Sequence, residues 1–313
     1  MDEDDVDLAD VDLSTGEYVP GGLFVPEKPK PTPGIRFSAT LIKAYQRCPA
    51  SAYGKMTRQP ETKGLPLVNG IAVHGGLEMF LRDERDAVQE FNRQFKFEAE
   101  KNSISITSDD AEKKRQEGEK MVASGQTLLS APNKEGVPFN QRVDKNLIES
   151  FFSIERDGRL FVGKFDLIHF TDRDLQRYSV IDYKTNKTMP GKFELDSDIQ
   201  FSMYAWAAAN DPTMPTYGVF PETNTWLHLR GKNIAKDENG KTVLKVKDKK
   251  WQFSFPTIRT PESVEQDFQE TIIPIAEAIE NNEWRRDKGD HCSWCGFFDR
   301  TNQRCGVDLP KMT

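Results

Sequence analysis

Two short stretches of the sequence place charged side chains where they could do chemistry. Asp166 lies in GKFDLI and Asp182 lies in VIDYKT, each inside an apolar run, and Lys184 follows Asp182 by two positions. A charged residue within an apolar strand usually needs a charged or metal partner. Because side chains alternate along a strand, Asp182 and Lys184 are predicted to share one face.

Two carboxylates and one ammonium group suit a hard divalent cation. If both runs form neighbouring strands, Asp166 and Asp182 come to the same end of a sheet, where their oxygens could bind Mg²⁺ or Mn²⁺. Such a cation can activate a water molecule, and Lys184 could balance the charge that develops on a phosphate. Taken alone, the D-x-K spacing is common in surface turns, so the prediction depends on the surrounding elements.

Upstream of the carboxylates, the sequence predicts helices. Ser38 is expected to cap a helix with apolar or small residues spaced by three and four, and Pro49 is expected to end it. Cys48 would then lie on the inward face at the helix end. Two further helical patterns follow, at residues 68–95 and 108–129.

From residue 146 onward, the pattern indicates strands. Residues 146–185 contain three apolar, aromatic-rich runs separated by the turn sequences RDG and TDRD, which predicts a three-stranded meander. A helix with an acidic start is predicted at 196–211, and strand-like runs follow at 225–230 and 241–255. Thr260 would cap a last helix, which Pro274 is expected to kink.

The cysteines form an uneven set. Cys292, Cys295 and Cys305 lie near the C-terminal end, and the other cysteine, Cys48, lies near the opposite end. In a reducing compartment, four cysteines that include a C-x-x-C favour a metal site over disulfides. Four thiolates suit Zn²⁺ or an iron–sulfur cluster, and ligand identity alone does not decide between them.

The acidic charge of the chain is confined to its first residues. Residues 1–34 hold nine acidic residues and two lysines, which accounts for the whole net charge of −7, so the total charge does not exclude a DNA partner. This proline-containing tail is predicted to be disordered, and it could recruit a protein partner. Its first residues, MDEDDVDLADVDL, lack the positive charge of a presequence, and no apolar run approaches the roughly 20 residues of a membrane span. A cytoplasmic protein without membrane contact is therefore expected.

These motifs, in this order, resemble those of the RecB-family exonucleases in the PD-(D/E)XK nuclease superfamily. The similarity is to the iron–sulfur branch, which contains the AddB-type nuclease domain and the CRISPR-associated exonucleases. It covers Phe37 to Cys305 and includes LIKAYQRCP, GIAVHGGLE, LIESFF, GKFD, DYKT and QFSMYAWA. The family's proline before the first aspartate is replaced by Phe165.

The resemblance implies a role for each matching residue. The implied metal ligands are His74, Asp166, Asp182 and the backbone carbonyl of Tyr183. Lys184 would be the catalytic lysine, and Glu149 would support the ligands or assist at the metal. Gln200 and Tyr204 would position the DNA strand or the lysine. The four implied ligands of a 4Fe-4S cluster, with structural Zn²⁺ as the alternative, are Cys48, Cys292, Cys295 and Cys305.

Two plainer interpretations remain open for these side chains. His74 could form an ordinary helix pair with Glu78, four residues later. Gln200 and Tyr204 could simply pack a helix against the sheet.

The implied fold is α/β, with a restriction-endonuclease-like core whose mixed central sheet is flanked by helices. A helical insertion and a C-terminal cysteine-cluster segment would be added to this core. Residues 1–34 are expected to form a disordered tail, and residues 35–145 a helical region with Cys48 and His74. Residues 146–259 would form the nuclease core, and residues 260–313 a final helix with the other cysteines.

The implied function is metal-dependent DNA exonuclease activity. The substrate would be single-stranded DNA or DNA ends, in recombination, repair or phage DNA metabolism, in a bacterial or phage-infected host cell. One alternative is DNA end processing for CRISPR adaptation. Another is a DNA-binding or recruitment protein that keeps the nuclease shell without turnover.

Overall fold

The computed structural model describes residues 34–133, 135–185, 191–229, 234–236, 242–244 and 256–310. The acidic tail, predicted to be disordered, falls outside these ranges apart from its last residue. Residues 245–255, most of the last strand-like run predicted from the sequence, also fall outside them. Thr32–Thr313 forms one compact unit.

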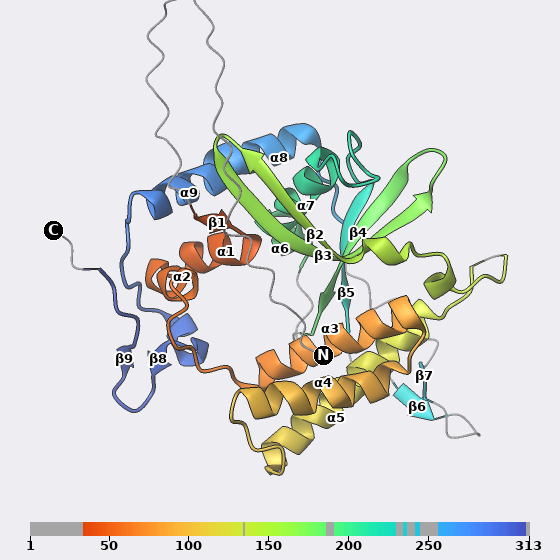
Figure 1. The fold of residues 1–313 in the computed structure, drawn as a ribbon, viewed down its shortest axis with the longest axis horizontal. Helices are drawn as coiled ribbons and strands as arrows, with labels where there is room; N and C mark the ends of the chain where they lie inside the picture. Colours follow the sequence, from red (N-terminus) through yellow and green to blue (C-terminus); the bar gives the residue numbers. More distant parts are fainter. Residues whose placement is uncertain are drawn as a thin grey trace, which may run out of the picture. The chain divides into compact units, whose positions relative to one another are not determined.

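A mixed sheet lies at the centre of the described chain (Figure 1). The predicted meander is confirmed, because β2 (Ile148–Arg156), β3 (Arg159–Asp172) and β4 (Arg177–Lys184) are antiparallel neighbours. Two strands add parallel pairs: β1 (Arg36–Phe37) beside β3, and β5 (Thr223–His228) beside β4. The strand β1 was not predicted, because it lies in the region expected to be helical.

Helices cover both faces of the sheet (Figure 1). On one face, α3 (Leu65–Asp83), α4 (Ala87–Lys101) and α5 (Asp109–Leu129) form a core with apolar side chains of β3, β4 and β5. The core on the other face includes apolar side chains of α1 (Ala39–Arg47), α7 (Ile199–Asn210), α8 (Pro261–Asp267) and α9 (Ile273–Glu280). Burial on two faces fixes the sheet between the helix layers.

Local sequence signals explain where the first helices begin. The Ser38 hydroxyl accepts a hydrogen bond from the Leu41 N–H at 3.2 Å and caps α1, as predicted. Pro49 follows the end of α1, as predicted, and it is also the first residue of a second helix, α2 (Pro49–Met56), which was not predicted. The helical pattern at 68–95 divides into α3 and α4, since Asp86 caps a new helix by accepting from the Gln89 N–H.

The helix near Pro274 is irregular. Thr260 caps α8 and Pro261 occupies its first turn, as predicted. A π-helical stretch, Phe268–Ile272, then separates α8 from α9. Proline has no N–H, and its ring would clash with the carbonyl four residues earlier in a regular helix. The kink predicted at Pro274 therefore appears as a wider π-helical turn just before this proline.

Along the paired strands β2 and β3, the side chains switch from one face of the sheet to the other at Glu149 and Asp166. Ile148 belongs to the core beneath α3, whereas Phe152 belongs to the core beneath α7. In a regular strand, residues four apart share one face. Glu149 has a φ of 50°, the left-handed region that non-glycine residues rarely adopt, and this conformation bends the strand. The bend brings Glu149 and Asp166 to the junction between the two cores.

Short ribbons complete the described chain. The strands β6 (Ile234–Lys236) and β7 (Thr242–Leu244) pair with each other, as do β8 (Phe298–Asp299) and β9 (Arg304–Cys305). A five-residue helix, α6 (Lys192–Asp196), precedes α7. Within the described residues, no helix combines the length and apolar character needed to cross a membrane.

The buried imidazole of His169 on β3 predicts a pH dependence of stability. His169 is 7% exposed, its ring packs edge-on against Phe139, and burial, assisted by the charge of Arg142, lowers its pKa to about 4. The folded state therefore favours neutral imidazole. The resulting stability is complete above the unfolded pKa of roughly 6.5 and is lost as the pH falls towards 4.

Replacing His169 by phenylalanine should remove this pH dependence. Between pH 7 and pH 4, the variant is expected to lose about 2 kcal/mol less of its unfolding free energy than the wild type does. Urea unfolding at the two pH values measures the difference. Equal losses in the two proteins would show that His169 does not titrate in this range.

Candidate active site

Three side chains from separate elements form a compact group of metal-ligand type. His74 comes from α3, Glu149 from the bend in β2 and Asp166 from β3, and their ligand atoms lie within 4.8 Å of one another. His74 Nδ1 is 3.3 Å from Asp166 Oδ1 and 3.8 Å from Glu149 Oε1. The alternative pairing of His74 with Glu78 is not what the structure shows, because the Glu78 carboxylate binds Arg82.

The charges in this group stabilise one another. Burial alone would lower the pKa of His74, but the negative charge of Asp166 and hydrogen bonding to Asp166 and Glu149 raise it to about 10. Burial opposes ionisation of Asp166, yet the positive charge of His74 holds the pKa of that carboxyl below its ordinary value. The protonated imidazole therefore balances the negative charge of the two carboxylates. A metal ion that binds His74 must displace its proton.

The residues of this group fit a divalent cation. Glu149 is 4% exposed, and its two carboxylate oxygens lie against the imidazole of His74 and the ammonium group of Lys164. Its charge is balanced by ion pairs with His74 and Lys164. A buried carboxylate held in a strained backbone conformation, next to an imidazole and a second carboxylate, is suited to metal coordination.

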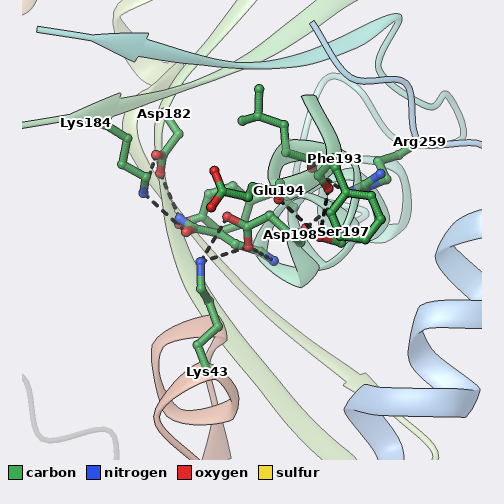
Figure 2. Close-up of polar contacts among 11 residues, drawn as sticks. Lys43, Asp182, Lys184, Phe193, Glu194, Ser197, Asp198 and Arg259 are labelled. Atoms are coloured by element: carbon green, nitrogen blue, oxygen red, sulfur yellow. Dashed lines mark hydrogen bonds and ion pairs between the residues drawn. The ribbon is translucent and has the colours of Figure 1, made fainter. Parts of the chain in front are cut away.

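The second group lies on the neighbouring strand. Leu167 pairs with Ile181, so Asp166 and Asp182 meet at the same point of β3 and β4. Lys184 Nζ is 2.5 Å from Asp182 Oδ2, and Figure 2 shows these two side chains facing each other. Burial raises the pKa of Asp182 to about 6 even though the positive charge of Lys184 lowers it. For Lys184, burial acts to lower the pKa, but Asp182 reverses this effect and raises it overall.

The helix α7 contributes an amide and a phenol to the second group. The Gln200 Nε2 amide donates to Asp182 Oδ1 at 2.8 Å and to the Tyr204 hydroxyl at 3.0 Å, and Lys184 Nζ donates to Gln200 Oε1 at 3.4 Å. The ring of Tyr204 also packs against Phe165. Both side chains of α7 thus contact the candidate site in addition to packing the helix on the sheet.

Tyr183 joins the two groups. Its backbone N–H donates to Asp166 Oδ2 at 2.6 Å, and its buried ring lies edge-on to His74 with the centroids 5.6 Å apart. The structure thus brings together all the catalytic and metal-binding residues predicted from the sequence. It groups Glu149 directly with His74 and Asp166, whereas Asp182 lies in the adjoining group.

Several charged residues near the site were missed by the sequence analysis. Lys164 binds Glu149 and lies two positions before Asp166, so strand alternation could have identified it. Lys43 on α1 binds both oxygens of Asp198, at 2.8 and 3.0 Å (Figure 2). Asp198 in turn caps α7 by accepting from the Gln200 N–H. Lys43 and Asp198 are 155 residues apart, and no local pattern indicates their contact.

The structure brings the cysteines at the two ends of the described chain together. All four are free thiols, and they line one cavity of about 310 Å³. Cys48 is 7% exposed and packs with Phe297 and Val307. Burial raises the pKa of the Cys295 thiol. The arrangement gathers the predicted ligand set at one place, with Cys48 joining the three cysteines near the C-terminus.

Direct contacts also hold the C-terminal segment against the first helices. The Ala50 N–H donates to the Arg285 carbonyl and the Thr62 N–H donates to the Gly296 carbonyl, both at 2.9 Å. A Cβ at Gly54 would lie 2.9 Å from the Phe297 ring, so this close approach requires glycine on α2. We call this contact region between residues 48–62 and 285–308 the clasp.

Two comparisons with known proteins found similarities. A family model described as "PD-(D/E)XK nuclease superfamily" matches residues 36–300. Among solved structures, the chain is similar to a crystal structure of a "Putative exonuclease" from Eubacterium rectale, with a TM-score of 0.49 and 13% identity over 82% of this chain and 86% of that chain. A search of curated proteins found no match. Since the family model covers most of the chain and every residue of the candidate active site, the chain belongs to the PD-(D/E)XK nuclease superfamily.

Proposed function

We propose that this protein is a Mg²⁺- or Mn²⁺-dependent exonuclease that hydrolyses phosphodiester bonds in single-stranded DNA or at DNA ends. The observation that carries the proposal is the convergence of His74, Glu149 and Asp166 beside the pair formed by Asp182 and Lys184. In a member of this superfamily, such a group suits metal-assisted hydrolysis of a phosphodiester.

The proposed metal ligands come from four elements, α3, β2, β3 and β4. His74, Asp166 and Asp182 would bind the ion, with the backbone carbonyl of Tyr183, and the geometry adds Glu149 as a candidate ligand. A bound ion would polarise the phosphate and lower the pKa of a water molecule. The Tyr183 N–H orients Asp166 by donating to one carboxylate oxygen, which leaves the other oxygen towards His74.

The chain's own residues would handle the charge of the phosphate. Lys184 is held in place by Asp182 and Gln200, so its ammonium group is oriented before substrate binds. A lysine fixed in this way stabilises the negative charge that increases as water attacks phosphorus. Tyr204 orients the Gln200 amide by accepting from it, so its own contribution is positional.

The iron–sulfur assignment forms a second part of the proposal. Cys48, Cys292, Cys295 and Cys305 would hold a 4Fe-4S cluster, as in the branch that the sequence resembles. The observation that supports it is that the four cysteines line one cavity. A single structural zinc ion is the alternative for the same four thiolates. The cluster would strengthen the clasp, because metal binding also stabilises the fold.

The same proposal assigns roles to the segments of the chain. Residues 146–259 would form the nuclease core, 35–145 would supply His74 and a helical insertion, and 260–313 would close the clasp. We place the enzyme in recombination, repair or phage DNA metabolism in the cytoplasm, with the acidic tail as a possible site for a protein partner. Processing of DNA ends for CRISPR adaptation would use the same chemistry.

A hydrolysis assay tests the proposed function. The anaerobically purified protein should degrade labelled DNA with Mg²⁺ or Mn²⁺ but not with EDTA, and Asp166→Ala and Lys184→Ala should each reduce the rate by about 10²-fold or more. Equal degradation by all three proteins would refute the proposed site. If the wild type bound DNA without hydrolysing it, the protein would instead be a DNA-binding protein that keeps the nuclease shell.

A further inference from the structure

An exposed aromatic ring lies beside the candidate metal site. Phe151 on β2 is 75% exposed, whereas the next residue, Phe152, is 3% exposed and packs into the core against Phe165. Strand alternation explains this contrast, because the two rings point to opposite faces of the sheet. A single exposed apolar residue is common in proteins, so the exposure of Phe151 by itself indicates no function.

The surroundings of Phe151 distinguish it. Phe151 pairs in register with Lys164 on β3, and Lys164 Nζ lies 5.6 Å from the centroid of the Phe151 ring. The same ammonium group forms the ion pair with Glu149, which contacts His74. One lysine therefore connects the exposed ring to the proposed metal ligands.

The chemical character of this pair suits a nucleic-acid strand. An exposed aromatic ring offers a face on which any base can stack, and such stacking tolerates every base because each has a flat face. The side chain of Lys164 is 42% exposed and offers a cation to a backbone phosphate. Inside a duplex, the neighbouring base pairs cover both faces of each base, so an unpaired base is better able to stack on the ring.

We propose that Phe151 is a specificity-determining residue, which stacks on an unpaired base beside the phosphate to be cut while Lys164 contacts the backbone. This inference rests on the proposed nuclease function and narrows its substrate to unpaired strands and frayed ends. The position of Phe151 on a strand of the central sheet keeps the ring at a fixed distance from the metal ligands. A base stacked on Phe151 determines which phosphate of the strand lies next to Asp166 and Lys184.

The chain contains a matched control for this pair. Phe97 on α4 is 58% exposed, and Lys101 Nζ lies 5.8 Å from the centroid of its ring. The ion pair of Lys101 is with Glu98, which is outside the candidate site. Phe97→Ala therefore removes an exposed ring of the same kind, with a lysine over it, without changing the contacts around Glu149.

The experiment compares the wild type with Phe151→Ala, Phe151→Trp and Phe97→Ala. Initial rates with Mn²⁺ are measured on a single-stranded oligonucleotide and on a blunt duplex of the same sequence. Phe151→Ala is expected to raise KM for the single strand about tenfold, with little change in kcat or in duplex cleavage, because one base stack is lost. Phe151→Trp should restore the wild-type KM, and Phe97→Ala should behave as the wild type.

A binding assay separates failure of this inference from failure of the proposed function. Fluorescence anisotropy with the same oligonucleotide in Ca²⁺ needs no turnover, and Phe151→Ala should weaken the Kd by about tenfold. Unchanged single-strand KM and Kd in Phe151→Ala, or equal losses on single strand and duplex, would overturn the stacking role even in an active nuclease. A wild type that binds without hydrolysing DNA would refute the proposed function, and a weaker Kd in Phe151→Ala would still support stacking.

Discussion

Replacing Asp166 by asparagine is expected to abolish Mn²⁺ binding at the active site, and with it DNA hydrolysis. Asp166 contacts His74 and belongs to the compact group of ligand atoms, so the variant loses both a ligand and the charge that holds the group together. Hydrolysis should fall by roughly 10³-fold or more, the scale at which enzymes lose rate when a central electrostatic group is removed. Isothermal titration calorimetry with Mn²⁺ measures the binding step separately from turnover.

The comparison with Lys184→Met makes this prediction specific. Lys184 contacts Asp182 and Gln200 but offers no ligand to the ion, so its loss should reduce hydrolysis by about 10²- to 10³-fold while Mn²⁺ still binds. An exposed carboxylate on α5, Asp110, provides the control, and Asp110→Asn should match the wild type in both measurements. If Asp166→Asn bound Mn²⁺ with the affinity of the wild type, the metal site would lie away from Asp166.

Replacing Cys48 by serine should destabilise the protein as much as replacing Cys305. Both cysteines line the same cavity, and the clasp joins segments separated by more than 200 residues of sequence. Each variant should lose its iron and the broad absorbance near roughly 400 nm. Each should also unfold roughly 10 °C lower, since a few kcal/mol corresponds to about that shift in a chain of this size.

The direct hydrogen bonds of the clasp should limit this effect. Gln59 and Asp308 exchange two hydrogen bonds, at 2.8 and 2.9 Å, which need no cluster, so the C-terminal segment should be loosened without being released. Ser293, exposed between the two cysteines of the C-x-x-C, provides the control, and Ser293→Ala should keep its iron. A colourless wild type with stoichiometric zinc would refute the cluster, and loss of iron from only one of the two cysteine variants would refute the assignment of Cys48 and Cys305 to the same cluster.

Local periodicity explains why much of the hairpin that carries the candidate site could be predicted from the sequence. Alternation placed Asp182 and Lys184 on one face, and the turn sequences RDG and TDRD set the antiparallel register that brings Asp166 beside them. The spacing of Gln200 and Tyr204 by one helical turn likewise predicted their contact. These relations involve neighbours on one element or on adjacent strands.

The remaining features depend on structure that no local pattern encodes. The left-handed conformation of Glu149 is unfavourable for this residue, so its sequence gives no sign of the bend that turns it towards His74. The pairing of β1 with β3 involves two residues on one side, too few to show alternation. The contact between Lys43 and Asp198 forms only when α1 packs near α7.

Anomalous diffraction from crystals soaked in Mn²⁺ tests the central claim most directly. The account predicts a manganese peak at the junction of β2, β3 and α3, with ligand distances of about 2.0–2.2 Å to His74 and Asp166. In crystals of Asp166→Asn, the peak should be absent. A catalytically active protein whose manganese peak lies away from these residues, or persists unchanged in Asp166→Asn, would contradict the proposed site.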